Sequence, residues 1–104
     1  MSHLIFYQGS ATWYRRIIRV ADGMVWDNSA NALGVATSWT DSALALSFDT
    51  VIGGHEINLP PSLPAGEYDI LFYDAASPLV TDELQIGKRI VWNGKGLSRL
   101  PVNL

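Results

Sequence analysis

Apolar and polar residues alternate along much of the chain with a period of two, which is the spacing of β-strands. The clearest case is residues 67–74, where Tyr68, Ile70 and Phe72 share one face and the intervening side chains share the other. The strands expected from this pattern and from runs of β-branched and aromatic residues are 4–7, 12–20, 24–26, 43–49, 56–59, 67–74, 81–86 and 88–92. No segment has the longer period of an amphipathic helix, and residues 30–36 have room for one helical turn at most.

Turn-forming residues separate these strands. Gly23 ends the sequence Ala-Asp-Gly at the place where strands 12–20 and 24–26 would form a hairpin, because glycine accepts the positive φ of a tight turn. Strands of this length and spacing, seven or eight in all, predict an all-β fold, namely a compact β-sandwich of immunoglobulin-like or jelly-roll type. The 104 residues fit one domain, so we expect residues 1–93 to form the sandwich and residues 94–104 to form an extended C-terminal arm.

The expected arm combines backbone freedom with apolar side chains. Gly94 and Gly96 loosen it, and Pro101 lies near its end. The aliphatic residues of the arm are Leu97, Leu100, Val102 and Leu104. Two interpretations are open: the arm covers the chain's own sheet, or it reaches onto a neighbouring subunit.

Charged residues are scarce and unevenly placed. They make up 16% of the chain, against about a quarter in a typical domain, so either the protein has a rather apolar surface or, as we favour, part of that surface is covered by a partner. The segment between Val20 and Gly87 holds all ten carboxylates and no lysine or arginine. Either the basic ends pair with the acidic middle, or the polarity steers docking on copies of the chain or another partner. A nucleic-acid partner is not expected, because phosphate binding needs a basic stripe.

The residues that carry catalysis in other proteins are missing or poorly placed. The chain has no cysteine, which excludes disulfides, thiolate catalysis and cysteine-based zinc sites. It also lacks a nucleophile elbow, a phosphate-binding glycine loop and a zinc-protease helix. His55 and Glu56 are adjacent and would point to opposite faces of a strand. The aspartates lie in turns without calcium-loop spacing, so we predict no enzyme activity, no cofactor and no metal.

No feature of the sequence predicts membrane insertion or secretion. No apolar run approaches the roughly 20 residues that a membrane helix needs. The N-terminal residues lack the basic region and long apolar core of a signal peptide. We therefore expect a protein made in the cytoplasm, with no membrane partner.

Tryptophan is frequent, at positions 13, 26, 39 and 92. Such residues fill cores, anchor protein interfaces or form platforms for sugars, and the sequence leaves these roles open. Trp39 lies in a polar setting, Thr-Ser-Trp-Thr, which makes it a candidate contact residue. The predicted interface residues are Trp39, Arg15, Arg16, Leu97, Leu100, Val102 and Leu104.

Four stretches, taken in order, suggest a family. They are HLIFYQGS at 3–10, MVWD at 24–27, LPAGEYDILFYDAA at 63–76 and IVWNG at 90–94. This order resembles small β-domain proteins encoded in the structural gene clusters of tailed bacteriophages and prophages. The resemblance implies a virion component, assembled in the host cytoplasm: a capsid decoration protein or a module of the neck, tail or baseplate. No functional residue carries over, because the shared motifs are framework.

The partners that this resemblance implies are other virion proteins and further copies of the chain, as a homo-oligomer. An alternative interpretation is a carbohydrate-binding β-sandwich module. Exposed tryptophans would then stack on the sugar rings of a host glycan, with nearby aspartate and asparagine as polar contacts. The two hypotheses differ in what the tryptophans do.

Overall fold

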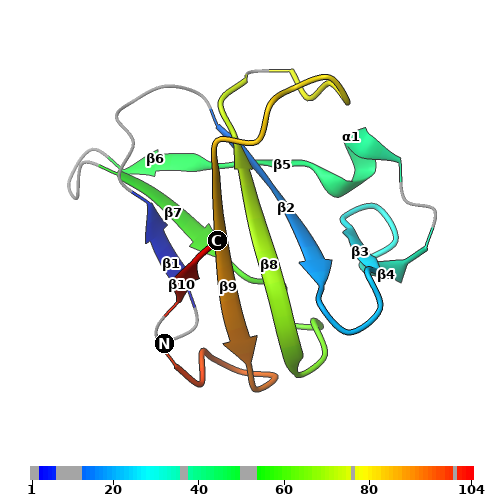
Figure 1. The fold of residues 1–104 in the computed structure, drawn as a ribbon, viewed down its shortest axis with the longest axis vertical. Coiled ribbons are helices and arrows are strands. Elements are labelled where there is room, and N and C mark those ends of the chain that lie inside the picture. Colours follow the sequence, from blue (N-terminus) through cyan, green and yellow to red (C-terminus); the bar gives the residue numbers. More distant parts are fainter. Residues whose placement is uncertain (1–2, 7–12, 36–37, 50–53, 76, 100) are drawn as a thin grey trace.

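The computed structural model describes residues 3–6, 13–35, 38–49, 54–75, 77–99 and 101–104. Within these residues the chain forms ten strands and one short helix (Figure 1). The strands are β1 (His3–Phe6), β2 (Tyr14–Arg19), β3 (Val25–Asp27), β4 (Ala32–Gly34), β5 (Leu44–Ala45), β6 (Ser47–Asp49), β7 (Gly54–Asn58), β8 (Gly66–Tyr73), β9 (Ile86–Trp92) and β10 (Val102–Asn103). The helix is α1 (Trp39–Ser42). The predicted all-β class is confirmed.

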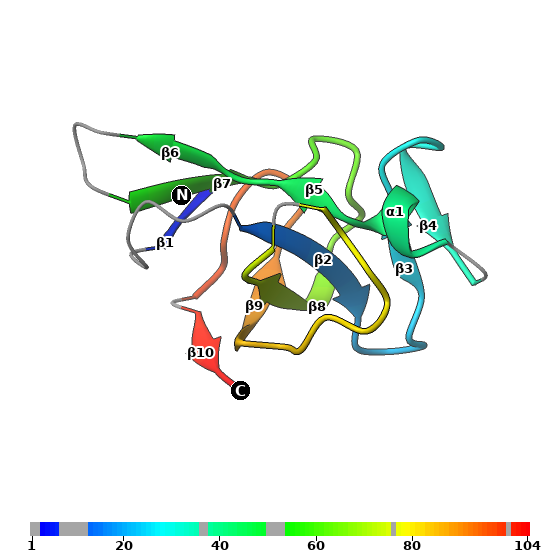
Figure 2. The same cartoon turned by 90° about the horizontal axis from the view of Figure 1, so that it is seen from above.

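The strands form two antiparallel sheets of unequal size. The larger sheet has the order β10-β9-β8-β2-β3-β4, with β5 also paired to β2, and the smaller has the order β1-β7-β6. Figure 2 shows the smaller sheet on one side of β2, β8 and β9. This arrangement is consistent with a sandwich, and its type, immunoglobulin-like or jelly-roll, stays a prediction.

The core lies on the inner face of the larger sheet. Tyr68, Ile70 and Phe72 of β8 are fully buried there, as their alternation predicts. The rest of the core cluster is Trp13, Ile17, Trp26, Leu59, Leu63, Ile90 and Trp92. Two hydrogen bonds tie the loop before β8 to this core: Trp92 Nε1 donates to the Leu63 carbonyl at 2.9 Å, and Tyr68 Oη donates to the Pro64 carbonyl at 2.7 Å.

Two strand predictions need correction. The expected strand 81–86 is a loop apart from its last residue, and Gly87 lies inside β9 instead of in a turn. A side chain at Gly87 would bring its Cβ within 2.8 Å of Leu104 Cδ1, so the glycine makes room for the C-terminal residue. The expected strand 43–49 is divided at Leu46, whose N–H donates to the Trp13 carbonyl at 2.9 Å. The division lets the chain pass from β5 in the larger sheet to β6 in the smaller one.

Residues 27–40, which lie between the expected strands 24–26 and 43–49, contain β4 and the start of α1. The helical turn thus lies at 39–42 and not within 30–36. Ser38 explains its position, because the side-chain oxygen of Ser38 caps the turn by accepting a bond from the Asp41 N–H at 3.3 Å. The capping serine thus makes Trp39 the first residue of α1.

The C-terminal arm lies against the chain's own sheet. In β10, Val102 pairs with Arg89 and Asn103 pairs with Lys88, which adds an edge strand beside β9. Leu97 forms an isolated bridge with Trp92 and packs against the core. The described part of the arm therefore covers the chain's own sheet, which is the first of the two interpretations. The predicted contact Leu100 lies outside the described residues.

Candidate functional site

The larger sheet has an outer face that points away from the smaller sheet (Figure 2). The register of β2, β8 and β9 sets which side chains share this face. They are Tyr14, Arg16 and Ile18 of β2, Glu67, Asp69, Leu71 and Tyr73 of β8, and Arg89 and Val91 of β9. Except for the two buried tyrosines, these residues are half-buried, so aliphatic and charged groups are accessible together on one side of the sheet.

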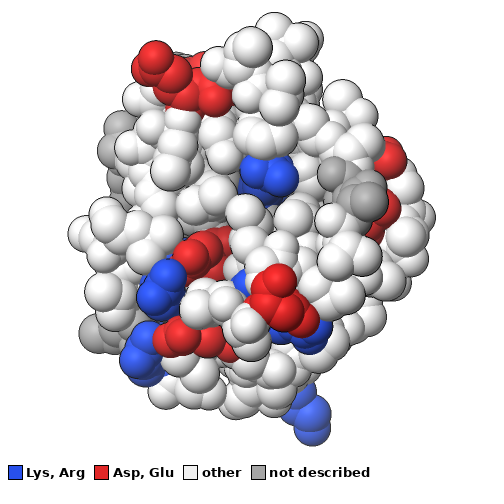
Figure 3. All heavy atoms as spheres, turned by 45° about the vertical axis from the view of Figure 1, so that its right-hand side comes forward, with Lys and Arg blue, Asp and Glu red and all other residues white. Residues whose placement is uncertain are grey.

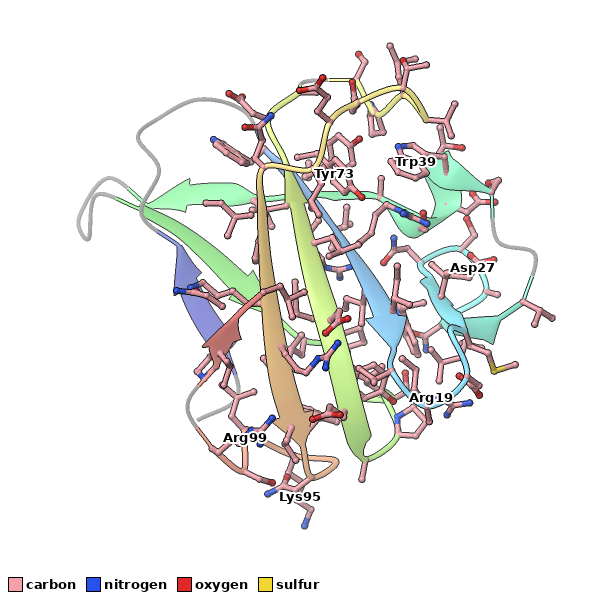
Figure 4. The ribbon with its side chains drawn as sticks, viewed as in Figure 1. Arg19, Asp27, Trp39, Tyr73, Lys95 and Arg99 are labelled. Atoms are coloured by element: carbon pink, nitrogen blue, oxygen red, sulfur yellow. The ribbon has the colours of Figure 1, made fainter. Side chains whose placement is uncertain are left out.

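Three aromatic side chains form a packed group at one end of this face. The rings of Tyr14 and Tyr73 stack with centroids 4.9 Å apart, and Trp39 meets Tyr73 edge-on at 5.3 Å. Figure 4 shows Trp39 reaching from α1 towards Tyr73. Trp39 Nε1 donates to Tyr14 Oη at 3.1 Å, and Tyr14 Oη donates to Asp82 Oδ2 at 2.6 Å. Burial of the ring, together with the bond to the Asp82 carboxylate, raises the pKa of Tyr14 to about 12.

Arg16 lies against this aromatic group. The central carbon of its guanidinium is 3.8 Å from the centroid of the Trp39 ring, which is a cation–π contact. Arg16 Nε donates to Ser42 Oγ at 2.8 Å, and Ser42 Oγ donates to the Trp39 carbonyl at 2.8 Å. Two residues predicted separately as interface contacts thus form one unit, the Arg16–Trp39 pair.

Arg15 was expected to contact a partner, and the structure corrects this. Its side chain is 1% exposed on the inner side of β2, where Nη1 donates to Asn28 Oδ1 at 3.4 Å. Burial lowers the pKa of Arg15 to about 10. The outer side of β2 is half-exposed at Arg16 and Ile18. The strand is nevertheless internal to the sheet, so the side chain that points inward cannot reach a partner.

The loop between β8 and β9 exposes three aliphatic side chains: Leu79 at 59%, Val80 at 72% and Leu84 at 51%. We call these three residues the apolar tip. Asp82 holds the loop in place, because its Oδ2 accepts the Leu79 N–H at 2.9 Å as well as the Tyr14 hydroxyl. The loop is therefore tied through Tyr14 to Trp39. Sequence reasoning missed this feature because Leu84 was assigned to the expected strand 81–86, and Leu79 and Val80, just before that strand, were given no role.

The predicted contacts in the arm divide into two kinds. Leu97 is half-buried and packs against the core cluster, whereas Val102 and Leu104 are exposed. Pairing opposite Arg89 places Val102 on the outer face, and the side chain of Leu104 lies over Gly87 on that same face. Among the described aliphatic residues of the arm, only Val102 and Leu104 are therefore available to a partner.

The ion pairs agree with the first interpretation of the charge distribution, in which the basic ends of the chain pair with its acidic middle. Three arginines from the basic ends pair with carboxylates of the acidic middle: Arg19 with Asp22 at 2.6 Å, Arg89 with Asp69 at 2.7 Å, and Arg99 with Glu67 at 3.1 Å. The loop from 74 to 85 carries three carboxylates, and none of them forms an ion pair within the described residues. Figure 3 shows this difference as an acidic patch at the top of the molecule and mixed charges below.

The tryptophans do not form a shared platform. Trp13, Trp26 and Trp92 are buried in the core, and the Arg16 guanidinium covers one face of Trp39. The carbohydrate-binding alternative therefore rests on the remaining exposure of Trp39 alone.

Neither a metal site nor a membrane helix is found in the described part of the chain. No group of three or more metal-ligating side chains comes together there. No helix among those residues is long and apolar enough to cross a membrane. Comparisons with protein-family models, curated proteins and solved structures found no match to this chain. The resemblance to phage β-domain proteins stays a prediction.

Removing the Tyr14 hydroxyl tests the bond network under the loop. In Tyr14→Phe, Asp82 loses a donor and Trp39 Nε1 loses its acceptor, so we expect the free energy of unfolding to fall by about 1–3 kcal/mol in urea denaturation. The matched control, Tyr73→Phe, removes a hydroxyl that has no partner among the described residues and should change stability by less than about 0.5 kcal/mol. Equal losses in the two variants would contradict the network.

The stabilising effect of the Tyr14 hydroxyl should also depend on pH. Because the pKa of Tyr14 rises from 10.0 to about 12 on folding, its stabilising effect is complete below pH 10 and is lost as pH rises towards 12. The stability difference between wild type and Tyr14→Phe should therefore shrink over this range. A constant difference would show that Tyr14 titrates alike in the folded and unfolded states.

Proposed function

We propose that this protein is a non-enzymatic structural component of a tailed-bacteriophage virion that acts by docking on protein subunits, including copies of itself. The observation that carries the proposal is the apolar tip, three aliphatic side chains that an anchored loop holds in water. Exposed apolar groups gathered in this way are typical of protein contact sites. Hydrogen bonds between Leu79, Asp82 and Tyr14 already hold this part of the loop, so docking there costs less conformational entropy.

The charges around the tip suggest how docking is steered. The loop carries Asp74, Asp82 and Glu83 and no basic side chain, so its partner surface should be apolar with a basic rim. The outer face of a second copy has this character, with exposed Val102 and Leu104 in the arm and the guanidinium of Arg16 on β2. Many weak contacts of this kind on a particle lattice would add up through avidity.

The decisive test is the protein's location after phage production. Particles purified by density gradient from the host that carries the gene should contain the chain in a fixed ratio to the major capsid or tail protein, measured by quantitative mass spectrometry. The lysate proteins that do not sediment with particles serve as the control. Finding the chain only in that soluble fraction would overturn the proposal.

Replacing the tip tests the docking surface itself. In Leu79→Ser/Val80→Ser, we expect self-association measured by sedimentation velocity to weaken at least about tenfold, because two aliphatic side chains no longer leave water. The thermal unfolding midpoint should not fall, since both side chains are exposed in the single chain. Val35→Ser, which changes an 85% exposed valine elsewhere on the surface, is the matched control and should associate like wild type. A wild-type chain that stays monomeric at high concentration would contradict docking between copies.

A further inference from the structure

Arg16 differs from the other arginines of the described chain in having an accessible guanidinium and no carboxylate partner. Arg19, Arg89 and Arg99 each form an ion pair, and Arg15 is buried. Arg16 is half-buried on the outer face, and its one hydrogen bond within the described residues is from Nε to Ser42 Oγ. The N–H groups of its Nη1 and Nη2 atoms therefore have no acceptor among the described residues.

The guanidinium is also held in a fixed position. Trp39 supports it from one side, and Ser42 holds Nε, so the group is oriented before any ligand arrives. Trp39 is in turn fixed by its bond to Tyr14 and by the edge contact with Tyr73. Ordering a free arginine costs binding energy, because its side chain has high rotamer entropy. Much of that cost is already met here by intramolecular contacts.

Neither Asp82 nor Asp69 neutralises the charge of Arg16. Asp82 is occupied by the Tyr14 hydroxyl and the Leu79 N–H and forms no ion pair with Arg16. Asp69 on the same face is engaged by Arg89 through two bonds of 2.7 and 3.0 Å. Arg16 thus has no ion pair with either Asp69 or Asp82, which leaves its positive charge for an external group.

We propose that Arg16, backed by Trp39, is a receptor site for a carboxylate group presented by the docking partner. The two Nη groups match the two oxygens of a carboxylate in a fork-to-fork arrangement. A singly charged carboxylate suits the site better than a dianionic phosphate, because Asp69 and Asp82 lie on the same side of the sheet and repel additional negative charge. The inference rests on the proposed docking function and names the chemistry of the partner group.

Acetate is the probe for the site. In ¹⁵N-labelled full-length protein, the Arg16 Nε–H and Trp39 Nε1–H signals are followed as sodium acetate replaces sodium chloride at constant ionic strength. We expect both signals to shift along one saturable curve, because the acetate binds at the Arg16–Trp39 pair. The Arg99 Nε–H signal is the internal control: Arg99 already pairs with Glu67, so its signal should show no saturation.

A matched variant separates fork recognition from general positive charge. Arg16→Lys keeps the charge but lacks the planar pair of donors, so acetate binding followed at Trp39 Nε1–H should weaken about tenfold. Shifts that stay linear and equal at Arg16 and Arg99 would overturn the proposal. Inorganic phosphate binding more tightly than acetate would overturn the carboxylate assignment.

The source of the carboxylate is tested by self-association. If a second copy supplies it, Glu83→Gln and Arg16→Gln should each weaken sedimentation-measured association of the full chain, and the double variant should lose no more than the stronger single one. If acetate fails to bind while Leu79→Ser/Val80→Ser still weakens association, the Arg16 site is wrong and the docking function stands. If acetate binds while the chain neither associates nor enters particles, the docking function is wrong and the Arg16 site remains.

Discussion

Trp92→Ala is expected to lower the free energy of unfolding by about 3–5 kcal/mol, the largest loss that we predict for this chain. The indole is buried in the core, and its Nε1 donates to the Leu63 carbonyl at 2.9 Å. Truncation would leave both a cavity and a carbonyl without its donor. A domain of this size has about 5–15 kcal/mol of stability in total, so the substitution would remove a large part of it. Urea denaturation followed by circular dichroism measures the loss.

Two further variants test whether the loss comes from the buried indole and its hydrogen bond. Trp92→Phe retains most of the apolar volume but not the donor, so it should cost less than Trp92→Ala and isolates the bond to Leu63. Val91→Ala changes the neighbouring residue, which is half-buried and points to the outer face, and should cost less than about 1.5 kcal/mol. A loss at Trp92 no greater than at Val91 would contradict the placement of the core on the inner face of β9.

The parts of the fold that follow from sequence are those where local pattern and tertiary contacts agree. Tyr68, Ile70 and Phe72 alternate cleanly, and β8 lies at the centre of the sheet with these residues in the core. Gly23 has a φ of 73° in the hairpin that joins β2 to β3, a conformation that suits glycine. Alternation and turn chemistry are short-range signals, so one sequence suffices to read them.

The errors occur where a contact distant in sequence decides the outcome. Gly87 has the appearance of a turn residue, yet it lies within β9 because Leu104, from the end of the chain, occupies the space above it. Residues 81–86 could form a strand by composition, but Asp82 instead binds Tyr14, 68 residues away. Local propensity is a weak guide when such a contact exists.

The candidate site shows the same limit. Arg15 and Arg16 are adjacent and chemically identical, and period-two alternation indicates only that they point to opposite faces. Both faces of the expected strand 12–20 carry aliphatic and aromatic side chains, so the sequence gives no sign of which one meets the core. Contact between Arg16 and Trp39 depends on α1 packing beside β2, which requires the folded chain.

The second prediction with a large effect is a gain in stability. Arg15→Met is expected to raise the free energy of unfolding by about 1–4 kcal/mol, because methionine fills similar space without bringing a charge out of water. Among the described residues Arg15 has a long 3.4 Å bond to Asn28 and no carboxylate, and its Nε has no partner. Asn28 remains held by bonds from its Nδ2 to the Asp41 and Ala43 carbonyls. Arg19→Met, which removes an exposed ion pair, is the control and should change stability by at most about 1 kcal/mol.

The pH dependence gives an independent measure of the same buried charge. Because burial lowers the pKa of Arg15 from 12.5 to about 10, the folded chain binds fewer protons than the unfolded chain between these values. The contribution of Arg15 to stability therefore rises with pH over this range, and the advantage of Arg15→Met over wild type should shrink as pH passes 10. Below pH 10 the advantage should be constant. A loss of about 3–5 kcal/mol in Arg15→Met at neutral pH would instead show that a negative group balances the guanidinium in the folded protein.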